Sequence, residues 1–151
     1  MRFLISLVAI LVLVTGAATE PIDRSNIYVQ SGDVVTKGSG TKRPARGQEY
    51  RIMGCDAPET TRAKCPNENE KGIRAAARLI EILNSGRIDL TEIRCPCRLG
   101  THGTKWCNLG RRCGRLTVNG EDVCKILIPE GHAVEYRCSE TKCVDQKNWC
   151  E

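Results

Sequence analysis

Cysteine content constrains this chain more than any other feature of its sequence. The 151 residues include ten cysteines, all of which lie after residue 54: Cys55, Cys65, Cys95, Cys97, Cys107, Cys113, Cys124, Cys138, Cys143 and Cys150. An even cysteine count is typical of a disulfide framework in a protein that folds in an oxidising compartment. Disulfides are therefore expected, although ten cysteines can pair in several hundred ways and the sequence leaves the pairing open.

A structural zinc site is the alternative use of four of these residues, namely Cys95, Cys97, Cys107 and Cys113. Zinc sites usually pair cysteines that are separated by two to four residues. Here one residue separates the first two cysteines and five residues separate the last two. This spacing favours disulfides over zinc.

The N-terminus predicts a compartment in which disulfides form. Arg2 is followed by an almost wholly apolar run over residues 3–14, and small residues then end at Ala18. This pattern indicates a secretory signal peptide over residues 1–18. The alternative is an uncleaved anchor, but the run is shorter than the roughly 20 residues of a membrane-spanning helix. We expect a mature chain from Thr19 to Glu151, secreted to the extracellular space or periplasm and not attached to a membrane.

Hydrophobic periodicity predicts an α+β domain that is mainly β. Alternating residues indicate strands at 26–30, 48–54, 87–93 and 113–118, and another strand begins at residue 34. A helix is expected over 67–85 and a shorter one over 121–130; the longer one rests on the helical spacing of Ile73, Ala76, Ala77, Ile80 and Leu83. This order suits a closed five-stranded barrel of the OB-fold type, stapled by disulfides. We expect the domain to span residues 19–137 and a cysteine-rich tail to follow over 138–151.

Five charged residues carry the candidate chemistry. Asp33 lies in an expected turn, and Arg111 lies in a long cysteine-rich loop over 94–112. Arg51 precedes Asp56 by five residues, and Glu59 follows Asp56 by three. Two carboxylates can hold a hard cation such as Ca²⁺, two arginines can clamp a phosphate, and a third carboxylate can position a water molecule. Each residue alone is common on protein surfaces, but together they predict a phosphoryl-transfer site.

Four short segments occur in an informative order along the chain. They are SGDVV at 31–35, RIMGCDAPE at 51–59, the expected helix, and LGR at 109–111 ahead of a strand and an Asn119-Gly120 turn. In this order they resemble the segments of the staphylococcal nuclease (thermonuclease) family, over about residues 27–136. The resemblance implies an OB-fold barrel and Ca²⁺-dependent hydrolysis of phosphodiester bonds in DNA and RNA.

The resemblance also implies a role for each candidate residue. Oxygen ligands for Ca²⁺ would come from two side chains and one main-chain carbonyl, those of Asp33, Asp56 and Ala57. Arg51 and Arg111 would bind the scissile phosphate, and Glu59 would orient or deprotonate the attacking water. Water would attack in line, the 5′-oxygen would leave, and the products would carry 3′-phosphates.

Three positions depart from the family's pattern. Ser31 stands where the family usually has an acidic residue, and Val34 stands where it usually has threonine. Both changes remove oxygen atoms from the neighbourhood of the expected metal. Leu109 replaces a common aromatic residue, which removes a ring on which a base or sugar could stack.

Cysteines bracket the segment that carries Arg111. Cys107 lies before it and Cys113 lies after it. We hypothesise a bridge between these two cysteines, which would hold the loop of Arg111 rigid when oxidised and leave it loose when reduced.

The formal charge of +5 permits a polyanionic partner. We predict a secreted monomeric nuclease that acts on single-stranded DNA or RNA without a stable protein partner. The sequence does not decide between DNA and RNA. Two other functions stay open: an OB-fold module that binds nucleic acid or another anionic ligand without cleaving it, and a disulfide-stapled toxin, inhibitor or structural protein.

Overall fold

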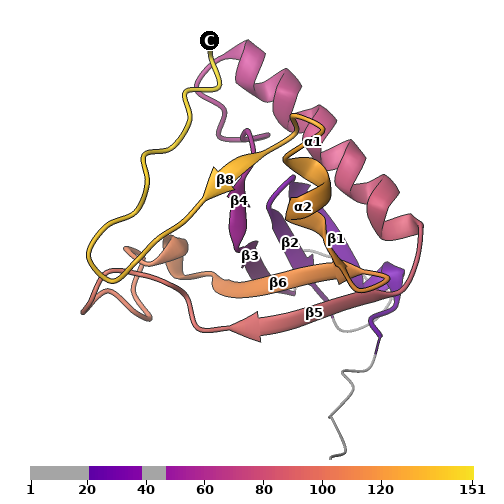
Figure 1. The fold of residues 1–151 in the computed structure, drawn as a ribbon, viewed down its shortest axis with the longest axis horizontal. Helices are drawn as coiled ribbons and strands as arrows, with labels where there is room; N and C mark the ends of the chain where they lie inside the picture. The colour runs from indigo at the N-terminus through magenta and orange to yellow at the C-terminus, as the bar shows by residue number, and fades with distance from the viewer. Residues whose placement is uncertain (1–20, 39–46) are drawn as a thin grey trace, which may run out of the picture.

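The computed structural model describes residues 21–38 and 47–151 (Figure 1). Its strands are β1 (Ile27–Ser31), β2 (Val34–Lys37), β3 (Gln48–Ile52), β4 (Gly54–Asp56), β5 (Ile88–Ile93), β6 (Arg112–Val118), β7 (Glu121–Asp122) and β8 (Val134–Tyr136). Its helices are α1 (Pro66–Asn84), α2 (Val123–Leu127) and the short 3₁₀-helices η1 (Arg24–Asn26) and η3 (Asn108–Gly110). The expected α+β class with a majority of strands is confirmed. The signal peptide expected over 1–18 lies outside the described residues.

The strands form one large sheet and one small sheet. The large sheet has the order β1-β2-β3-β6-β5, and β7 pairs with β6. β3 and β6 are parallel, whereas the other neighbours in this sheet are antiparallel. β4 and β8 form a separate antiparallel pair. No closed barrel is found among the described strands, although the N–H of Ile22 donates to the carbonyl of Ile88 at 2.8 Å, between the segment before β1 and the start of β5.

The strand expected over 48–54 is divided in two. Gly54 has a φ of +108°, a conformation that residues with a side chain rarely adopt. The chain leaves the large sheet after Ile52, and β4 pairs with β8 instead. The expectation of one continuous strand is therefore wrong, because a left-handed glycine redirects the backbone.

Helix α1 lies within one residue of its predicted ends but buries a different face. The expected apolar face included Ile73 and Ile80, which are 56% and 38% exposed. Ala75, Leu79 and Ile82 are buried in the core instead. The helix is therefore rotated by about one residue relative to the face predicted from its isoleucines.

Close backbone contacts explain this rotation. A Cβ at Gly72 would lie 2.3 Å from the carbonyl oxygen of Glu59, and a Cβ at Gly32 would lie 2.9 Å from the Cβ of Ala75. Small residues therefore let two segments of backbone approach α1 closely. One segment is the β1–β2 turn, which contains Asp33, and the other contains Glu59, so the helix supports both of these candidate site residues.

All ten cysteines are paired in five disulfides: Cys55–Cys124, Cys65–Cys150, Cys95–Cys113, Cys97–Cys107 and Cys138–Cys143. The four cysteines of the zinc alternative therefore form two disulfides and offer no thiolate to a zinc ion. The hypothesised bridge between Cys107 and Cys113 is wrong, because both residues pair across the loop with the earlier cysteines at 95 and 97. The loop that carries Arg111 is nevertheless closed twice.

The C-terminal residues are held against the start of α1. Cys150 is bonded to Cys65, which caps the helix. The ammonium group of Lys71 donates to the carbonyls of Trp149 and Glu151 at 3.0 and 2.7 Å. Figure 1 shows the end of the chain beside the N-terminal end of α1.

Five disulfides indicate an oxidising compartment outside the cytoplasm. Among the residues described, none of the helices has the length and apolar character needed to cross a membrane.

Candidate active site

The centre of the candidate site is a buried cluster of one arginine and two aspartates. Asp33 follows β1, Arg51 belongs to β3, and Asp56 ends β4. The Nη1 of Arg51 pairs with Oδ2 of Asp33, and its Nη2 donates to Oδ1 of Asp56 at 2.8 Å. All three residues are buried, with between 4% and 6% of their surface exposed. These ion pairs are therefore shielded from water.

Strand register and local hydrogen bonds position Asp33 in this cluster. Val34 lies opposite Arg51 in the β2–β3 pair, which places the preceding aspartate beside the arginine. The hydroxyl of Ser31 donates to Oδ1 of Asp33 at 2.7 Å, and the N–H of Ala57 donates to Oδ2 at 3.0 Å. Asp33 is therefore held by three donors and is more than a turn residue.

The buried cluster carries a formal charge of −1, since one guanidinium faces two carboxylates. Burial lowers the pKa of Arg51, Asp56 opposes this shift, and the charge of Arg111 adds to it. The guanidinium stays protonated at neutral pH all the same, because arginine titrates far above that range. The uncompensated negative charge would be stabilised by one more cation nearby.

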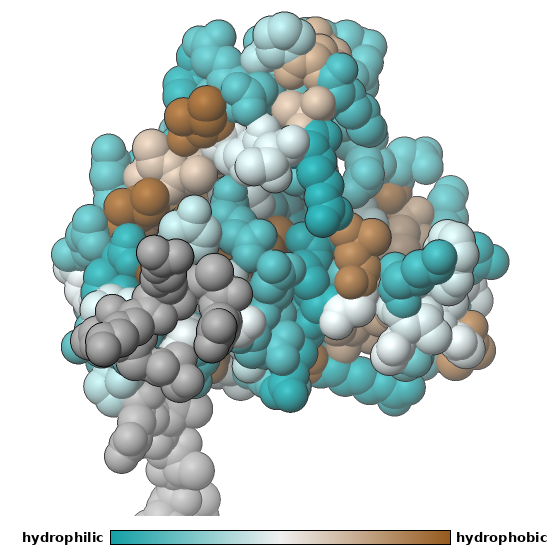
Figure 2. Space-filling view, turned by 180° about the vertical axis from the view of Figure 1, so that it is seen from behind, coloured by the Kyte–Doolittle hydropathy of each residue, from teal (hydrophilic) through white to brown (hydrophobic). Residues whose placement is uncertain are grey.

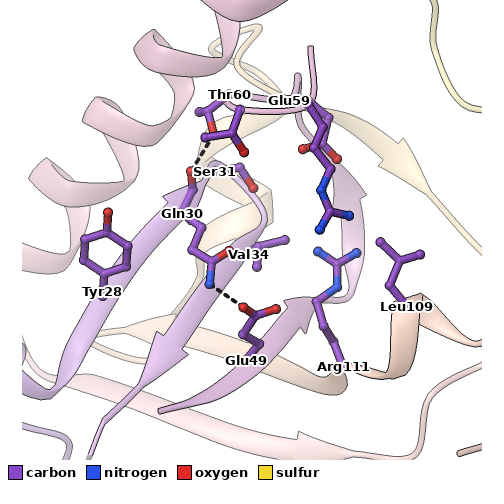
Figure 3. Close-up of a pocket in the computed structure, with 11 residues that line it drawn as sticks. Tyr28, Gln30, Ser31, Val34, Glu49, Glu59, Thr60, Leu109 and Arg111 are labelled. Atoms are coloured by element: carbon purple, nitrogen blue, oxygen red, sulfur yellow. Dashed lines mark hydrogen bonds between the residues drawn. The ribbon is translucent and has the colours of Figure 1, made fainter. Parts of the chain in front are cut away.

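A polar pocket of about 280 Å³ lies next to this cluster. Ser31 connects the pocket to the cluster, because it lines the pocket and donates to Asp33. Figure 3 shows Glu59 and Arg111 on opposite sides of the pocket, with a second guanidinium between their side chains. The structure thus brings together two of the five predicted charged residues in space that a ligand can enter.

The charges around the pocket act directly on Arg111. Burial lowers the pKa of Arg111, whereas Glu59 and Glu49 raise it and Arg62 lowers it further. The Nε of Arg111 donates to the carbonyl of Asn108 at 2.9 Å, which fixes the side chain near the end of η3. The fixed guanidinium of Arg111 and the nearby guanidinium of Arg62 are together suited to an anion with several oxygen atoms.

A buried carboxylate holds the segment that carries Glu59. Oε2 of Glu68 accepts from the N–H of Lys64 at 2.6 Å, and Oε1 accepts from the N–H of Glu59 at 3.5 Å. The hydroxyl of Thr60 donates to the carbonyl of Gln30 at 2.9 Å (Figure 3). These contacts tie residues 59–64 to α1 on one side and to β1 on the other.

Arg51 does not line the pocket, and neither do Asp33 and Asp56. The arginine that was expected to bind a phosphate is instead directed at the two expected metal ligands. The candidate site therefore has a buried part, formed by Asp33, Arg51 and Asp56, and an open part, which is the pocket lined by Glu59 and Arg111. Ser31 contacts both parts.

Arg62, Glu49 and Gln30 line the pocket but were not predicted as site residues. Arg62 follows the DAPE segment by three residues, in a stretch with no periodic pattern. Glu49 and Gln30 lie on strands, and Gln30 donates to the carboxylate of Glu49 at 3.0 Å. Sequence alternation could have placed these two on one face of the sheet, but it carried no sign of a pocket.

The donor set of the buried part suits a hard cation. Two carboxylates and a nearby main-chain carbonyl are the kind of oxygen ligands that Ca²⁺ prefers. Both oxygens of Asp33 and one oxygen of Asp56 already accept hydrogen bonds or ion pairs. A bound cation would therefore share these carboxylates with Arg51.

A second cluster of possible ligands lies elsewhere, at Cys65, Glu68 and Cys150. Its two sulfur atoms are bonded to each other in a disulfide. Metal binding by cysteine requires the thiolate, so this oxidised cluster is not a metal site.

Neither a protein-family model nor a curated protein matches this chain.

Proposed function

We propose that this chain is a secreted, Ca²⁺-dependent nuclease of the staphylococcal nuclease type that hydrolyses single-stranded DNA or RNA. One observation carries the proposal: Glu59 and Arg111 line opposite sides of a polar pocket that adjoins the buried Asp33–Arg51–Asp56 cluster. The pocket offers a base and an anion-binding group, and the cluster offers oxygen ligands and an excess negative charge.

The proposal includes an OB-fold barrel. The sheet order places β1 and β5 at opposite edges. The Ile22–Ile88 bridge links the segment before β1 to β5, so it connects these two edges. Barrel closure needs such a connection between the first and last strands of the sheet.

The residues of the pocket suit hydrolysis of a phosphodiester. A phosphate would be bound by Arg111, with Arg62 as a second donor, and Glu59 would accept a hydrogen bond from the attacking water. The water oxygen forms the new bond to phosphorus, the bond from phosphorus to the 5′-oxygen breaks, and a proton ends on that oxygen. Guanidinium groups stabilise the charge that builds up on the phosphoryl oxygens in the transition state.

Ca²⁺ would be held by Asp33, Asp56 and the main-chain carbonyl of Ala57. When bound, Ca²⁺ supplies positive charge that stabilises the negative phosphoryl oxygens. The formal charge of −1 on the cluster supports binding of a cation there, and the loss of oxygen atoms at Ser31 and Val34 predicts weak affinity.

A second candidate function is supported by the orientation of Arg51. Its guanidinium pairs with Asp33 and Asp56, and Arg51 does not line the pocket. A protein with this arrangement could bind an anionic ligand through Arg111 and Arg62 without cleaving it. In that case Arg51 is the permanent counterion of the two aspartates.

Cleavage of a labelled single-stranded DNA by the oxidised protein tests the proposal. The reaction is run with Ca²⁺, with Mg²⁺ and with a chelator, and in parallel with Arg111→Ala. We expect cleavage that depends on Ca²⁺ and falls by about 10³-fold or more in the variant, by analogy with arginines that contact a transferred phosphoryl group.

Arg74→Ala is the matched control, because Arg74 is exposed on α1 and pairs only with Glu70 among the described residues. This variant should cut at the parental rate. Binding of the DNA without cleavage under any metal would refute the nuclease and leave the binding module. Equal cleavage by Arg111→Ala and the parent would show that the pocket is not the site.

A further inference from the structure

The loop over residues 94–112, from the end of β5 to the first residue of β6, concentrates positive charge. It contains five basic residues and no acidic residue, whereas the whole chain has a formal charge of +5: Arg94, Arg98, Lys105, Arg111 and Arg112. Across the two described ranges, only Arg112 of these five forms an ion pair, with Glu92 at 2.8 Å. Figure 1 shows the loop extending beyond the ends of β5 and β6. Most of its charge is therefore available to a polyanion.

Two disulfides hold this loop in one conformation. Cys95 is bonded to Cys113 and Cys97 to Cys107, so the loop is closed at its base and again near its middle. The side-chain amide of Asn108 lies 3.4 Å from the sulfur of Cys97 and 3.1 Å from that of Cys113. A loop that is ordered in advance loses little conformational entropy when it binds a partner.

An aromatic ring stands out from the surface of this rigid loop. Trp106 is 77% exposed, although tryptophan is usually largely buried. The ammonium group of Lys105 lies 4.9 Å from the centre of its ring, and one ammonium can cover only one face. Figure 2 shows pale and brown residues among the hydrophilic ones on the side where the loop lies. The open face of this ring is suited to stacking on a flat group.

The loop is continuous with the candidate active site. A second pocket of about 270 Å³ is lined by Arg94, His102, Cys107 and Arg111, among others, and Arg111 also lines the first pocket. Trp106 precedes Cys107 directly and lies five residues before Arg111. Five residues span at most about 18 Å, a distance that a few nucleotides of a single strand can cover. A strand whose phosphate lies at Arg111 can therefore reach Trp106.

We propose that the loop over residues 94–112 is a docking surface for single-stranded nucleic acid, in which a base stacks on Trp106 and Arg94, Arg98 and Lys105 contact phosphates. Basic grooves with exposed aromatic rings bind single strands in this way, because each base offers a π-face and each phosphate a negative charge. Trp106 supplies the ring that Leu109 does not. The inference rests on the proposed function, since the docked strand is the one that enters the pocket.

Binding of oligothymidylate in the presence of a chelator tests the docking surface without cleavage. An oligomer of about 12 nucleotides falls within the usual site size of single-strand-binding domains. We expect Trp106→Ala to weaken binding roughly five- to 150-fold, the range found when one stacking aromatic is removed, and Trp106→Phe to restore most of it. Ile73→Ala is the control, because Ile73 is exposed on α1 outside the loop.

Tryptophan fluorescence gives a second and direct measurement. The chain has two tryptophans, and Trp149 is only 5% exposed. Quenching by oligothymidylate therefore reports on Trp106, and it should vanish in Trp106→Ala. Equal affinity of Trp106→Ala and the parent, or unchanged fluorescence, would overturn the docking surface. A fluorescence response to phosphatidylserine vesicles but not to oligothymidylate would also overturn it, in favour of a membrane surface.

The cleavage assay separates failure of this inference from failure of the proposed function. An abasic oligonucleotide offers phosphates to Arg111 but no base to stack on Trp106, so Trp106→Ala should cleave it at the parental rate while its KM for a strand with bases rises. Loss of the fluorescence response in a protein that still cleaves would overturn the docking surface alone. Binding by the loop in a protein that cleaves nothing would overturn the nuclease alone.

Discussion

The predicted charged residues occupy two different environments. Asp33, Arg51 and Asp56 are buried in mutual ion pairs, whereas Glu59 and Arg111 face a pocket open to solvent. Breaking a buried ion pair leaves a charge without a partner in a region that water cannot reach, whereas a solvated charge contributes little to stability. The difference teaches that the buried part contributes more to the stability of the fold, while the open part is accessible to a ligand from solvent.

The same substitution at the two arginines gives the largest expected contrast. Arg51→Met leaves two buried carboxylates without a cation, so we expect the free energy of unfolding to fall by about 3–5 kcal/mol. Arg111→Met removes a hydrogen bond to one carbonyl, and we expect a loss of less than about 1 kcal/mol. Urea denaturation of both variants measures the difference. Equal losses of stability would break the comparison.

The second contrast concerns one disulfide that closes the loop of Arg111 and one that lies in the C-terminal tail. Removing the Cys95–Cys113 bridge with two serines should cost about 3 kcal/mol, and removing the Cys138–Cys143 bridge about 2 kcal/mol, because the second closes a shorter loop. Nuclease activity should fall only in the first variant, since its loop carries Arg111. Thermal unfolding and the cleavage assay provide the two measurements, and a matched loss of activity in both would contradict the prediction.

Arg62→Gln tests whether a charge in the open part of the site contributes to activity but not to stability. Arg62 is exposed and lines the pocket, so its loss should leave the free energy of unfolding within about 0.5 kcal/mol of the parent. We expect kcat/KM for single-stranded DNA to fall about tenfold, the effect of one charge-assisted hydrogen bond to a phosphate. Arg74→Gln on α1 should change neither quantity. A parental kcat/KM in Arg62→Gln would remove Arg62 from the site.

The smallest expected effect is the pH dependence of Tyr50, a buried residue whose hydroxyl donates to Glu92 at 3.1 Å. Burial raises the pKa of Tyr50, and Glu92 raises it further. The pKa of Tyr50 is therefore higher in the folded protein than in the unfolded chain. The protonated hydroxyl stabilises the fold below about pH 10, and this contribution is lost as the pH rises through the pKa of the folded protein. Tyr50→Phe should therefore lose less stability than the parent between about pH 9 and pH 11, measured by denaturant titration. A steeper loss in the variant would reverse this assignment.

Local sequence signals predicted much of the fold. Alternating residues located β1, β3, β5 and β6, and helical spacing located α1 to within one residue. The prediction of which face of α1 is buried was wrong. Contacts between α1 and distant parts of the chain, at Gly32 and at Gly72, decide which side is buried. Hydropathy of a single helix contains no information about such contacts.

The sequence predicted five candidate site residues but not how they are arranged. The spacing of Arg51, Asp56 and Glu59 identified the residues, yet the direction of the Arg51 side chain depends on Asp33 from another strand. Arg62 was missed because its place in the pocket follows from contacts of the 59–64 segment with α1. Disulfide pairing is likewise a property of the folded chain, and the sequence leaves it open.

The pattern of disulfides has a consequence for a protein exposed to proteases. The Cys55–Cys124 and Cys65–Cys150 bridges overlap, so every peptide bond between Cys55 and Cys150 lies inside at least one covalent ring. A single proteolytic cut anywhere in this stretch opens the backbone but does not release a fragment. Such a nicked molecule keeps its mass under non-reducing conditions and separates into two pieces only after reduction.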